Sequence, residues 1–390
     1  MRNRILVCTI ALVWGALASR AAIALPAQEP LFLANGVRPM VMFAMSVDHQ
    51  LFKKAFDDYT NLDGEGPIEN TYTDSFDYYG YFDSNRCYSY DSAAGYFEPG
   101  DEADGPNGHH CDSSDWSGNF LNWATMTRID VLRKALYGGK RAVDTADQTV
   151  LERAYLANDV HSFAKVFTPA SGDSTKNYTP YSAATITMCN STPQPPVGEP
   201  DESQNIDTAT NPPKMRIVSG DWGRWAAGER NQCEFYENAK AANQNAGIVP
   251  PYAANLFAPG SKDAPNVKVS VCVPNKSENE DCGTYESGLD DNVSLKPVGL
   301  LQRYGEDGTL RFGLTSGSYQ NRDKGGVLRK AISNFAGNSD ANEDEVNLAD
   351  GTFNTSVQGI VYTLDKVRLN TWDYGDTHYN DCDTFSIGIN

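Results

Sequence analysis

Two stretches of the chain alternate apolar and polar residues with the period of two that a half-buried β-strand requires. Residues 267–273 place a valine at every second position, and residues 310–314 do the same with leucine and phenylalanine. Residues 39–46 form a short, almost continuous apolar run, which is typical of a central strand covered on both faces. These three patterns predict three strands.

Helical periodicity occurs in four places. The strongest pattern begins near Ser117 and ends at Gly138-Gly139, because glycine commonly terminates a helix. Its apolar residues fall on one face of a single helix: Leu121, Ala124, Ile129, Leu132, Ala135 and Leu136. Residues 48–59, 297–304 and 357–367 predict shorter helices. Helices that alternate with strands favour an α/β sheet with helices on both faces.

Three segments show no such periodicity. Residues 61–98 predict loop and hairpin, residues 98–116 are rich in Gly and Asp, and residues 190–214 are too proline-rich and acidic to order themselves. The tyrosines of residues 72–97 allow two interpretations. They form an adhesive surface, because tyrosine combines large contact area with a polar tip, or they pack a hairpin around Cys87.

The N-terminus predicts export. Arg2 and Arg4 precede an apolar run of about 14 residues, and Ala22-Ile23-Ala24 supplies small residues for signal peptidase. We therefore expect residues 1–24 to be a signal peptide and residues 25–390 to be the mature chain. No later stretch is apolar enough to cross a membrane, so we do not expect an integral membrane protein.

Seven cysteines remain after such cleavage, and an oxidising compartment favours their pairing. Cys272 and Cys282 are close in sequence, and Pro274-Asn275 between them can turn the chain back, so these two are predicted to pair. Neighbours along the chain suggest two further bonds, Cys87–Cys111 and Cys189–Cys233. Cys382 is left over, and its partner is expected beyond Asn390. The absence of Cys-x-x-Cys argues against a zinc ribbon or a thioredoxin-type site.

The chain is strongly acidic, with a net charge of −19, which excludes a protein that tracks phosphate backbones. One acidic segment instead fits a calcium loop. Its alternating oxygen ligands, with Gly66 at the turn, match the start of such a loop: Asn61, Asp63, Glu65, Pro67 (through its carbonyl) and Glu69. Tyr72 stands where a bidentate glutamate is usual, so an acidic turn without an ion is the alternative.

Catalytic motifs are absent from the sequence. It contains no Gly-x-Ser-x-Gly elbow, His-Glu-x-x-His or phosphate-binding loop. His109-His110-Cys111 offers transition-metal ligands, but a disulfide at Cys111 works against that use. We expect no enzyme. Carboxylates are abundant enough for a glycosidase pair, so a secreted, calcium-stabilised polysaccharide hydrolase is the alternative.

Four stretches resemble a known family. They are FDYYGYFDSNRCYSY (76–90), SGNFLNWATMTRIDVLRKALYGG (117–139), KPVGLLQRYG (296–305) and LRFGLTSGSY (310–319). Together they resemble the N-terminal region of PilY-type (PilC/PilY family) proteins, which are adhesins of type IV pilus tips. The likeness covers most of residues 35–390.

The resemblance implies a fold and a function. It implies that residues 25–390 form a von Willebrand factor A-like domain, an open α/β sheet with helices on both faces. Long disulfide-stapled insertions are expected at about residues 60–116 and 168–262. Family members continue into a C-terminal β-propeller, and this chain is expected to stop before it. The implied role is attachment and pilus assembly at the periplasm, pilus tip or cell surface, with minor pilins and a host or abiotic surface as partners.

The expected metal site of such a domain is altered here. The usual Asp-x-Ser-x-Ser after the first strand corresponds to Ser46-Val47-Asp48-His49-Gln50. A hydroxyl replaces the leading carboxylate and both serines are missing, so a hard cation loses ligands and charge. Asp48 is expected to contribute at most to a degenerate site.

Overall fold

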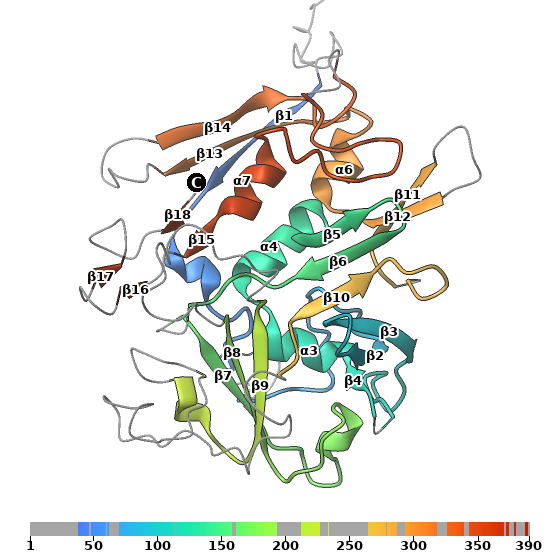
Figure 1. Cartoon of the computed structure of the whole chain (residues 1–390), viewed down its shortest axis with the longest axis vertical. Helices are drawn as coiled ribbons and strands as arrows, with labels where there is room; N and C mark the ends of the chain where they lie inside the picture. The colour runs from blue at the N-terminus through green and yellow to red at the C-terminus, as the bar shows by residue number, and fades with distance from the viewer. Residues whose placement is uncertain are drawn as a thin grey trace, which may run out of the picture. The chain divides into compact units, whose positions relative to one another are not determined.

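The computed structural model describes residues 38–46, 48–59, 61, 70–112, 114–157, 161–192, 212–226, 233, 264–277, 279–286, 293–317, 326–338, 343–369, 372–373, 378–379 and 387–388. The elements described below all lie in one compact unit, Met40–Asn390. They form a mixed α/β fold of several small sheets and few helices (Figure 1).

The largest sheet has six strands in the order β4-β2-β3-β10-β6-β5. Its members are β4 (Trp116–Ser117), β2 (Arg86–Asp91), β3 (Tyr96–Glu102), β10 (Lys268–Val271), β6 (Gln148–Glu152) and β5 (Arg141–Thr145). Two antiparallel hairpins, β2–β3 and β5–β6, are joined by β10, which runs parallel to β3 and antiparallel to β6. The predicted strand at residues 267–273 is therefore present, and Val269 and Val271 are buried.

A second sheet is antiparallel and has the order β7-β8-β9. Its strands are β7 (Phe163–Phe167), β8 (Ile186–Ser191) and β9 (Lys214–Ser219). Every residue of the central strand β8 is buried. The remaining pairs are short: β11 (Cys282–Glu286) with β12 (Val293–Pro297), β15 (Arg368–Leu369) with β18 (Ile387–Gly388), and β16 (Trp372–Asp373) with β17 (His378–Tyr379).

The third sheet joins the first strand of the described chain to two strands that begin at Arg311 and Gly326. β1 (Met40–Met45) runs parallel to β13 (Arg311–Gly317), and β14 (Gly326–Ser333) runs antiparallel to β13 on the other side (Figure 1). Val41, Phe43 and Met45 pack on the core beneath the sheet. Both strands predicted from residues 39–46 and 310–314 are thus present.

The expected burial of β1 was wrong. Among the described residues β1 pairs only with β13, and its exposure alternates along the strand. Met40 on the outer face is 61% exposed and Met42 is 41% exposed. An apolar run predicts a strand, but the elements that cover a strand come from other parts of the chain.

The long helix predicted from residue 117 is two helices, α3 (Gly118–Thr125) and α4 (Arg128–Tyr137). Thr127 and Asp130 form a capping box that begins α4, and Gly138 ends it in a left-handed conformation. Apolar periodicity continued across the break, so the prediction of one helix was wrong. The pattern Thr-x-x-Asp was the signal that could have located the second start.

The other predicted helices vary in accuracy. Residues 48–59 form only a single 3-10 turn, η1 (His49–Phe52), so the helix expected there was wrong. The helices α6 (Leu300–Gly305) and α7 (Ile360–Lys366) occur where the sequence predicted them. In the described part of the chain, no helix has the length and apolar character needed to span a membrane.

The buried side chains form separate clusters. The largest surrounds α3 and is strongly aromatic, with Tyr78, Phe120 and Trp123 among its members. A second cluster lies between β13, α6 and α7 and includes Phe312 and Leu364. Residues of α4 belong to the second and third clusters and pack against the first. This helix therefore connects the cores.

Candidate functional site

The predicted calcium loop falls almost entirely outside the described residues. Asn61 is described, whereas Asp63, Glu65, Pro67 and Glu69 are not. The calcium site therefore stays a prediction.

The end of β1 uses its polar oxygens locally. The Ser46 hydroxyl accepts a hydrogen bond from the Asp48 amide at 3.0 Å, and the Asp48 carboxylate accepts one from the Gln50 amide at 2.9 Å. Asp48 thereby caps the 3-10 turn that follows. The His49 ring lies beside His161, with Nδ1 and Nε2 3.3 Å apart. These contacts give Ser46 and Asp48 a structural role in the turn.

His109 and His110 serve different partners. Nδ1 of His109 donates to the Asp74 carbonyl at 2.6 Å, and its Nε2 lies 3.1 Å from the Asp77 carboxylate. Nε2 of His110 lies 3.1 Å from the Tyr178 hydroxyl. Within the described residues these two rings belong to no group of three convergent metal ligands. Their contacts hold loops together.

Two asparagines of α3 organise the tyrosine-rich segment. Asn119 Oδ1 accepts from the Tyr78 amide at 2.7 Å, and its Nδ2 donates to the Phe76 carbonyl at 2.9 Å. Asn122 accepts from the Phe82 amide at 3.0 Å and donates to the carbonyls of Tyr78 and Phe82, each at 2.8 Å. The two asparagines are one helical turn apart, so both face the same loop.

The loop that they hold approaches the helix very closely. A Cβ placed on Gly80 would lie 2.1 Å from the Asn122 carboxamide oxygen and 2.6 Å from a carbon of Met126. The segment has few backbone partners of its own, so the carboxamides substitute for a strand ladder. The unusual Asn-Phe-Leu-Asn motif thus has a physical reason.

Most tyrosines of this segment are core residues. Tyr72, Tyr78, Tyr81 and Tyr88 are buried, whereas Tyr79 is exposed. Tyr72 contacts the rings of Phe120, Trp123 and Tyr178. The packing interpretation therefore holds for these four residues, and a broad adhesive tyrosine surface does not form there.

Three disulfides are present, and they join the cysteines paired in the sequence prediction: Cys87–Cys111, Cys189–Cys233 and Cys272–Cys282. The seventh cysteine, Cys382, lies outside the described residues. Three such bonds are typical of a chain that folds in an oxidising compartment.

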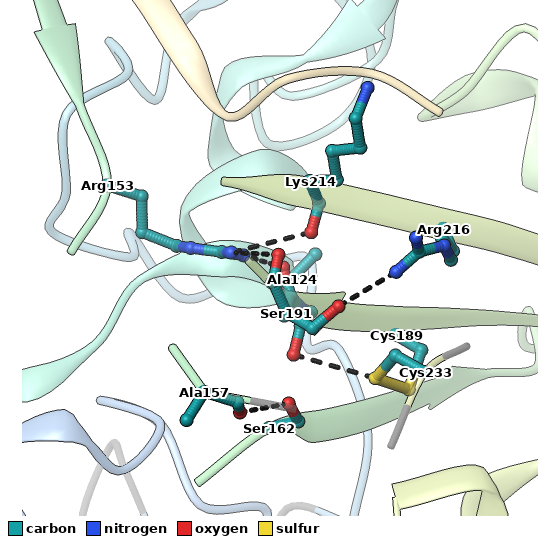
Figure 2. The surroundings of a disulfide bond; sticks show 10 residues. Ala124, Arg153, Ala157, Ser162, Cys189, Ser191, Lys214, Arg216 and Cys233 are labelled. Atoms are coloured by element: carbon teal, nitrogen blue, oxygen red, sulfur yellow. Dashed lines mark hydrogen bonds between the residues drawn. A yellow bond between two sulfur atoms is a disulfide. The ribbon is translucent and has the colours of Figure 1, made fainter. Parts of the chain in front are cut away.

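Figure 2 shows the surroundings of Cys189–Cys233, where the six-stranded sheet meets the β7–β9 sheet. Arg153, directly after β6, donates to the Asn190 side chain and to the carbonyls of Ser191 and Lys214. Burial lowers the pKa of the Arg153 guanidinium to about 9. No sequence pattern marked this residue, because its partners become neighbours only through long-range strand pairing.

A cavity of about 280 Å³ lies beside the middle of β3, the start of β6 and the end of β10, and Pro99, Thr149, Cys272 and Lys276 are among its lining residues. Cys272 has a left-handed backbone, with φ of 54°. Its amide donates to Glu280 Oε2, which also lies 3.7 Å from the Cys282 sulfur. Burial raises the pKa of Glu280 to about 7.

Cys272, Glu280 and Cys282 form a cluster of possible metal ligands. Cys272, Glu280 and Cys282 place their sulfur and oxygen atoms within 4.8 Å of one another, and no other set of three in the described part of the chain does so. The second carboxylate oxygen, Oε1 of Glu280, is buried and makes no hydrogen bond. In the structure the two sulfurs are bonded, so they are not metal ligands in this state.

A second cavity, of about 300 Å³, lies beside α7 and has mostly apolar walls, including Phe353, Val357 and Val361. Two carboxylates border it, but both have partners. Glu345 pairs with Lys330 at 2.9 Å, and Asp365 accepts a hydrogen bond from the Tyr137 hydroxyl at 2.6 Å. No histidine lines either of these two cavities.

Comparison with known proteins identifies the class to which this disulfide-stapled α/β fold belongs. Residues 69–218 match a family described as the small alpha/beta domain of the PilY1 homolog. Residues 312–388 match the second domain of the PilY1 homolog. The chain therefore carries two PilY1-homolog domains, and the resemblance noted for residues 76–90 and 117–139 falls within the first.

The similar proteins are longer than this chain. It is 33% identical over 358 residues to a type IV pilus biogenesis factor PilY1 homolog from Xylella fastidiosa (strain Temecula1), an alignment that covers 87% of the chain and 22% of the relative. A second protein with that name from the same organism is 42% identical over 95 residues, covering 23% of the chain and 8% of the relative. The chain thus spans about a fifth of the first relative's length. No solved structure matches.

Proposed function

We propose that this chain is part of a type IV pilus biogenesis factor that acts outside the inner membrane, in pilus assembly and surface attachment, without catalysis. The observation that carries this proposal is the 33% identity over 87% of the chain to a protein named for that role. The two matched domains point in the same direction.

The disulfides and the charge support the location. Six cysteines are paired in three bonds, which cytosolic thiols would reduce. A net charge of −19 keeps such a protein in solution outside the cell. Minor pilins at the pilus tip and a receptor on a host or abiotic surface are the proposed partners.

We also propose that the von Willebrand factor A-like part is the β1–β13–β14 sheet with α4, α6 and α7. Support comes from the pairing of β1 with β13, which are parallel neighbours although residues 46–310 lie between them. A parallel pair requires a crossover connection, and here that connection contains three further sheets, namely the six-stranded sheet, β7-β8-β9 and β11-β12. The insertions proposed at about residues 60–116 and 168–262 would supply β2, β3, β4, β8 and β9 of those sheets, whereas β5, β6, β7 and β10 lie outside these ranges.

Gene deletion tests the proposed role. A strain that lacks the gene is expected to show fewer surface pili and weaker attachment than its parent, and the wild-type gene is expected to restore both. A matched pair of complementing genes sharpens the test: Cys189→Ser/Cys233→Ser removes a buried bond, whereas the exposed substitution Glu286→Gln leaves the fold intact. Normal pili and attachment in the deletion strain would overturn the proposal.

A glycan screen separates the alternative. Purified protein is incubated with polysaccharides and aryl glycosides, and released sugar is measured. Two results together would favour the secreted hydrolase: the purified protein releases sugar faster than buffer alone, and the deletion strain has normal pili.

A further inference from the structure

The three disulfides differ in how far they are enclosed. Cys87, Cys111, Cys189 and Cys233 are all buried. In the third bond Cys272 forms part of the wall of the 280 Å³ cavity, and Cys282 is only partly buried, alone among the six paired cysteines that the structure describes. Cys272 itself is buried, with 4% of its surface exposed, so access to this bond comes through the cavity beside Cys272 and from the partly exposed Cys282.

We propose that Cys272–Cys282 is a redox-exchangeable disulfide that reacts with an external dithiol, and that Glu280 is the acid that protonates the departing Cys282 thiolate. Thiol–disulfide exchange needs access to one sulfur and a stabilised leaving group at the other. The cavity supplies access to Cys272. Glu280 Oε2 lies 3.7 Å from the Cys282 sulfur and supplies the proton. This inference rests on local geometry and does not depend on the pilus role.

The reaction balances with the dithiol as the reductant. A thiolate of the dithiol attacks the Cys272 sulfur, a mixed disulfide forms, and the Cys282 sulfur leaves with the bonding electron pair. Protonated Glu280 transfers its proton to that sulfur. The second thiol of the dithiol then displaces Cys272, so that the dithiol is oxidised to its disulfide and both protein cysteines are reduced.

The surroundings of Glu280 fit an acid that works near neutral pH. Burial raises its pKa to about 7, against the opposing effect of the Lys134 and Arg86 cations and with a smaller contribution from the Asp83 carboxylate, so a protonated carboxyl is present at about pH 6. Oε1 is buried without a hydrogen-bond partner. The proton that moves is carried by Oε2, which lies 3.7 Å from the Cys282 sulfur and still accepts the hydrogen bond from the Cys272 amide after the transfer.

The backbone at Cys272 is left-handed, as it also is at Cys233 of the Cys189–Cys233 bond, so this conformation does not by itself distinguish the two bonds. Cys272 is one of four non-glycine residues with positive φ in the described chain, and its φ of 54° lies in the left-handed region. Side chains rarely adopt that conformation, and the disulfide with its ten-residue spacing holds it in place. Reduction frees the loop after β10 to relax, whereas the Lys276 ammonium still donates to the Pro99 carbonyl at 2.8 Å.

The test uses the full oxidised chain, with the other two disulfides as internal standards. The protein is treated with dithiothreitol under native conditions, quenched with an alkylating reagent at timed intervals, and mapped by peptide mass spectrometry. Cys272 and Cys282 are expected to be labelled at least about tenfold faster than the other four cysteines. Simultaneous labelling of all six, or labelling of this pair last, would overturn the exchangeable bond.

The role of Glu280 has its own readout. At about pH 6, with rates expressed per dithiothreitol thiolate, Glu280→Gln is expected to react about tenfold more slowly than wild type. Glu286→Gln, an exposed change on the same hairpin, is expected to react as wild type does. The wild-type rate per dithiothreitol thiolate is also expected to fall as the pH rises through about 7, and this measurement needs no variant. A flat wild-type profile, or equal rates for both variants, refutes the assignment of Glu280.

Discussion

Replacing Asn122 with alanine should strongly destabilise the fold. Asn122 is fully buried on α3 and makes three hydrogen bonds, all to the backbone of the tyrosine-rich segment. Alanine removes all three partners at once. The Phe82 amide and the Phe82 carbonyl then lose these bonds in a site from which water is excluded, whereas the Tyr78 carbonyl keeps the hydrogen bond from the Ser84 hydroxyl at 3.1 Å.

The magnitude follows from the cost of unsatisfied buried groups. Each buried donor or acceptor left without a partner costs about 1–3 kcal/mol, and relaxation recovers part of the sum. We therefore expect Asn122→Ala to lower the free energy of unfolding by about 3–5 kcal/mol. A typical domain has about 5–15 kcal/mol in total, so the loss is a large fraction.

Urea denaturation of the oxidised protein, followed by tryptophan fluorescence, measures the effect. The midpoint is expected to fall while the slope stays constant, which separates lost stability from an altered unfolded state. Asn107→Ala is the control, because Asn107 makes one hydrogen bond at an exposed site, to Asp74 at 2.6 Å. Its expected cost is below about 1 kcal/mol.

Asn122→Asp gives a second signature. Aspartate keeps an acceptor for the Phe82 amide but turns an oxygen toward two carbonyls that need donors. It should be at least as damaging as alanine near neutral pH and partly recover in acid, because a protonated carboxyl donates one bond. If Asn122→Ala costs less than about 1 kcal/mol, the carboxamides do not hold the segment and this reasoning fails.

The other predictions concern ions, protons, disulfides and processing. Calcium at 100 times Kd should stabilise the wild-type protein by about 2.7 kcal/mol, and it should stabilise Asp63→Ala far less. The measurement is Tm with calcium and with chelator. If the Tm of the wild-type protein does not depend on calcium, residues 61–69 form an acidic turn without an ion. Burial raises the pKa of Glu280 from 4.5 to about 7. Between these two pH values the folded state binds more protons than the unfolded state, so the free energy of unfolding falls as the pH rises from 4.5 to about 7. Glu280→Gln should abolish this fall and gain about 1–3 kcal/mol at alkaline pH in urea titrations, and an unchanged pH dependence would contradict it. Removing Cys189–Cys233, which has a sequence separation of 44, should lower the free energy of unfolding by about 4 kcal/mol in the loop-entropy model. Removing Cys272–Cys282, which has a separation of 10, should lower it by less, and equal losses would count against the model. Edman sequencing of exported protein should begin directly after Ala24, and a chain that starts at Met1 would disprove cleavage.

Local sequence patterns located the strands β1, β10 and β13 well, but they did not predict which segments would lie beside those strands. The alternation of valines in residues 267–273 identified β10, yet nothing in it indicated that this strand would join two hairpins from earlier in the chain. The apolar run at 39–46 identified β1 but overestimated its burial. Periodicity of side chains reports which face is apolar, whereas the covering partner depends on distant segments.

The candidate sites divide in the same way. Disulfides between cysteines that are neighbours in the sequence could be predicted, since a short loop brings them together easily. The group around Glu280 could not, because a glutamate inside an acidic loop looks solvated until the hairpin after it folds over the carboxylate. Arg153 was missed for a related reason: its acceptors belong to β8 and β9, which the sequence separates widely from β6.

The sequence by itself predicted the resemblance to the PilY-type family, three disulfide pairs, the strands β1, β10 and β13, and the helices α6 and α7, because these depend on motifs and on patterns among residues close along the chain. Tertiary structure alone decided that β1 lies beside β13 across residues 46–310, that the tyrosines are core residues, and that two asparagines carry the loop above α3. Those outcomes depend on which surfaces remain to be buried once the local elements have formed. The periodicity of apolar residues within one segment does not indicate which distant segment will cover it.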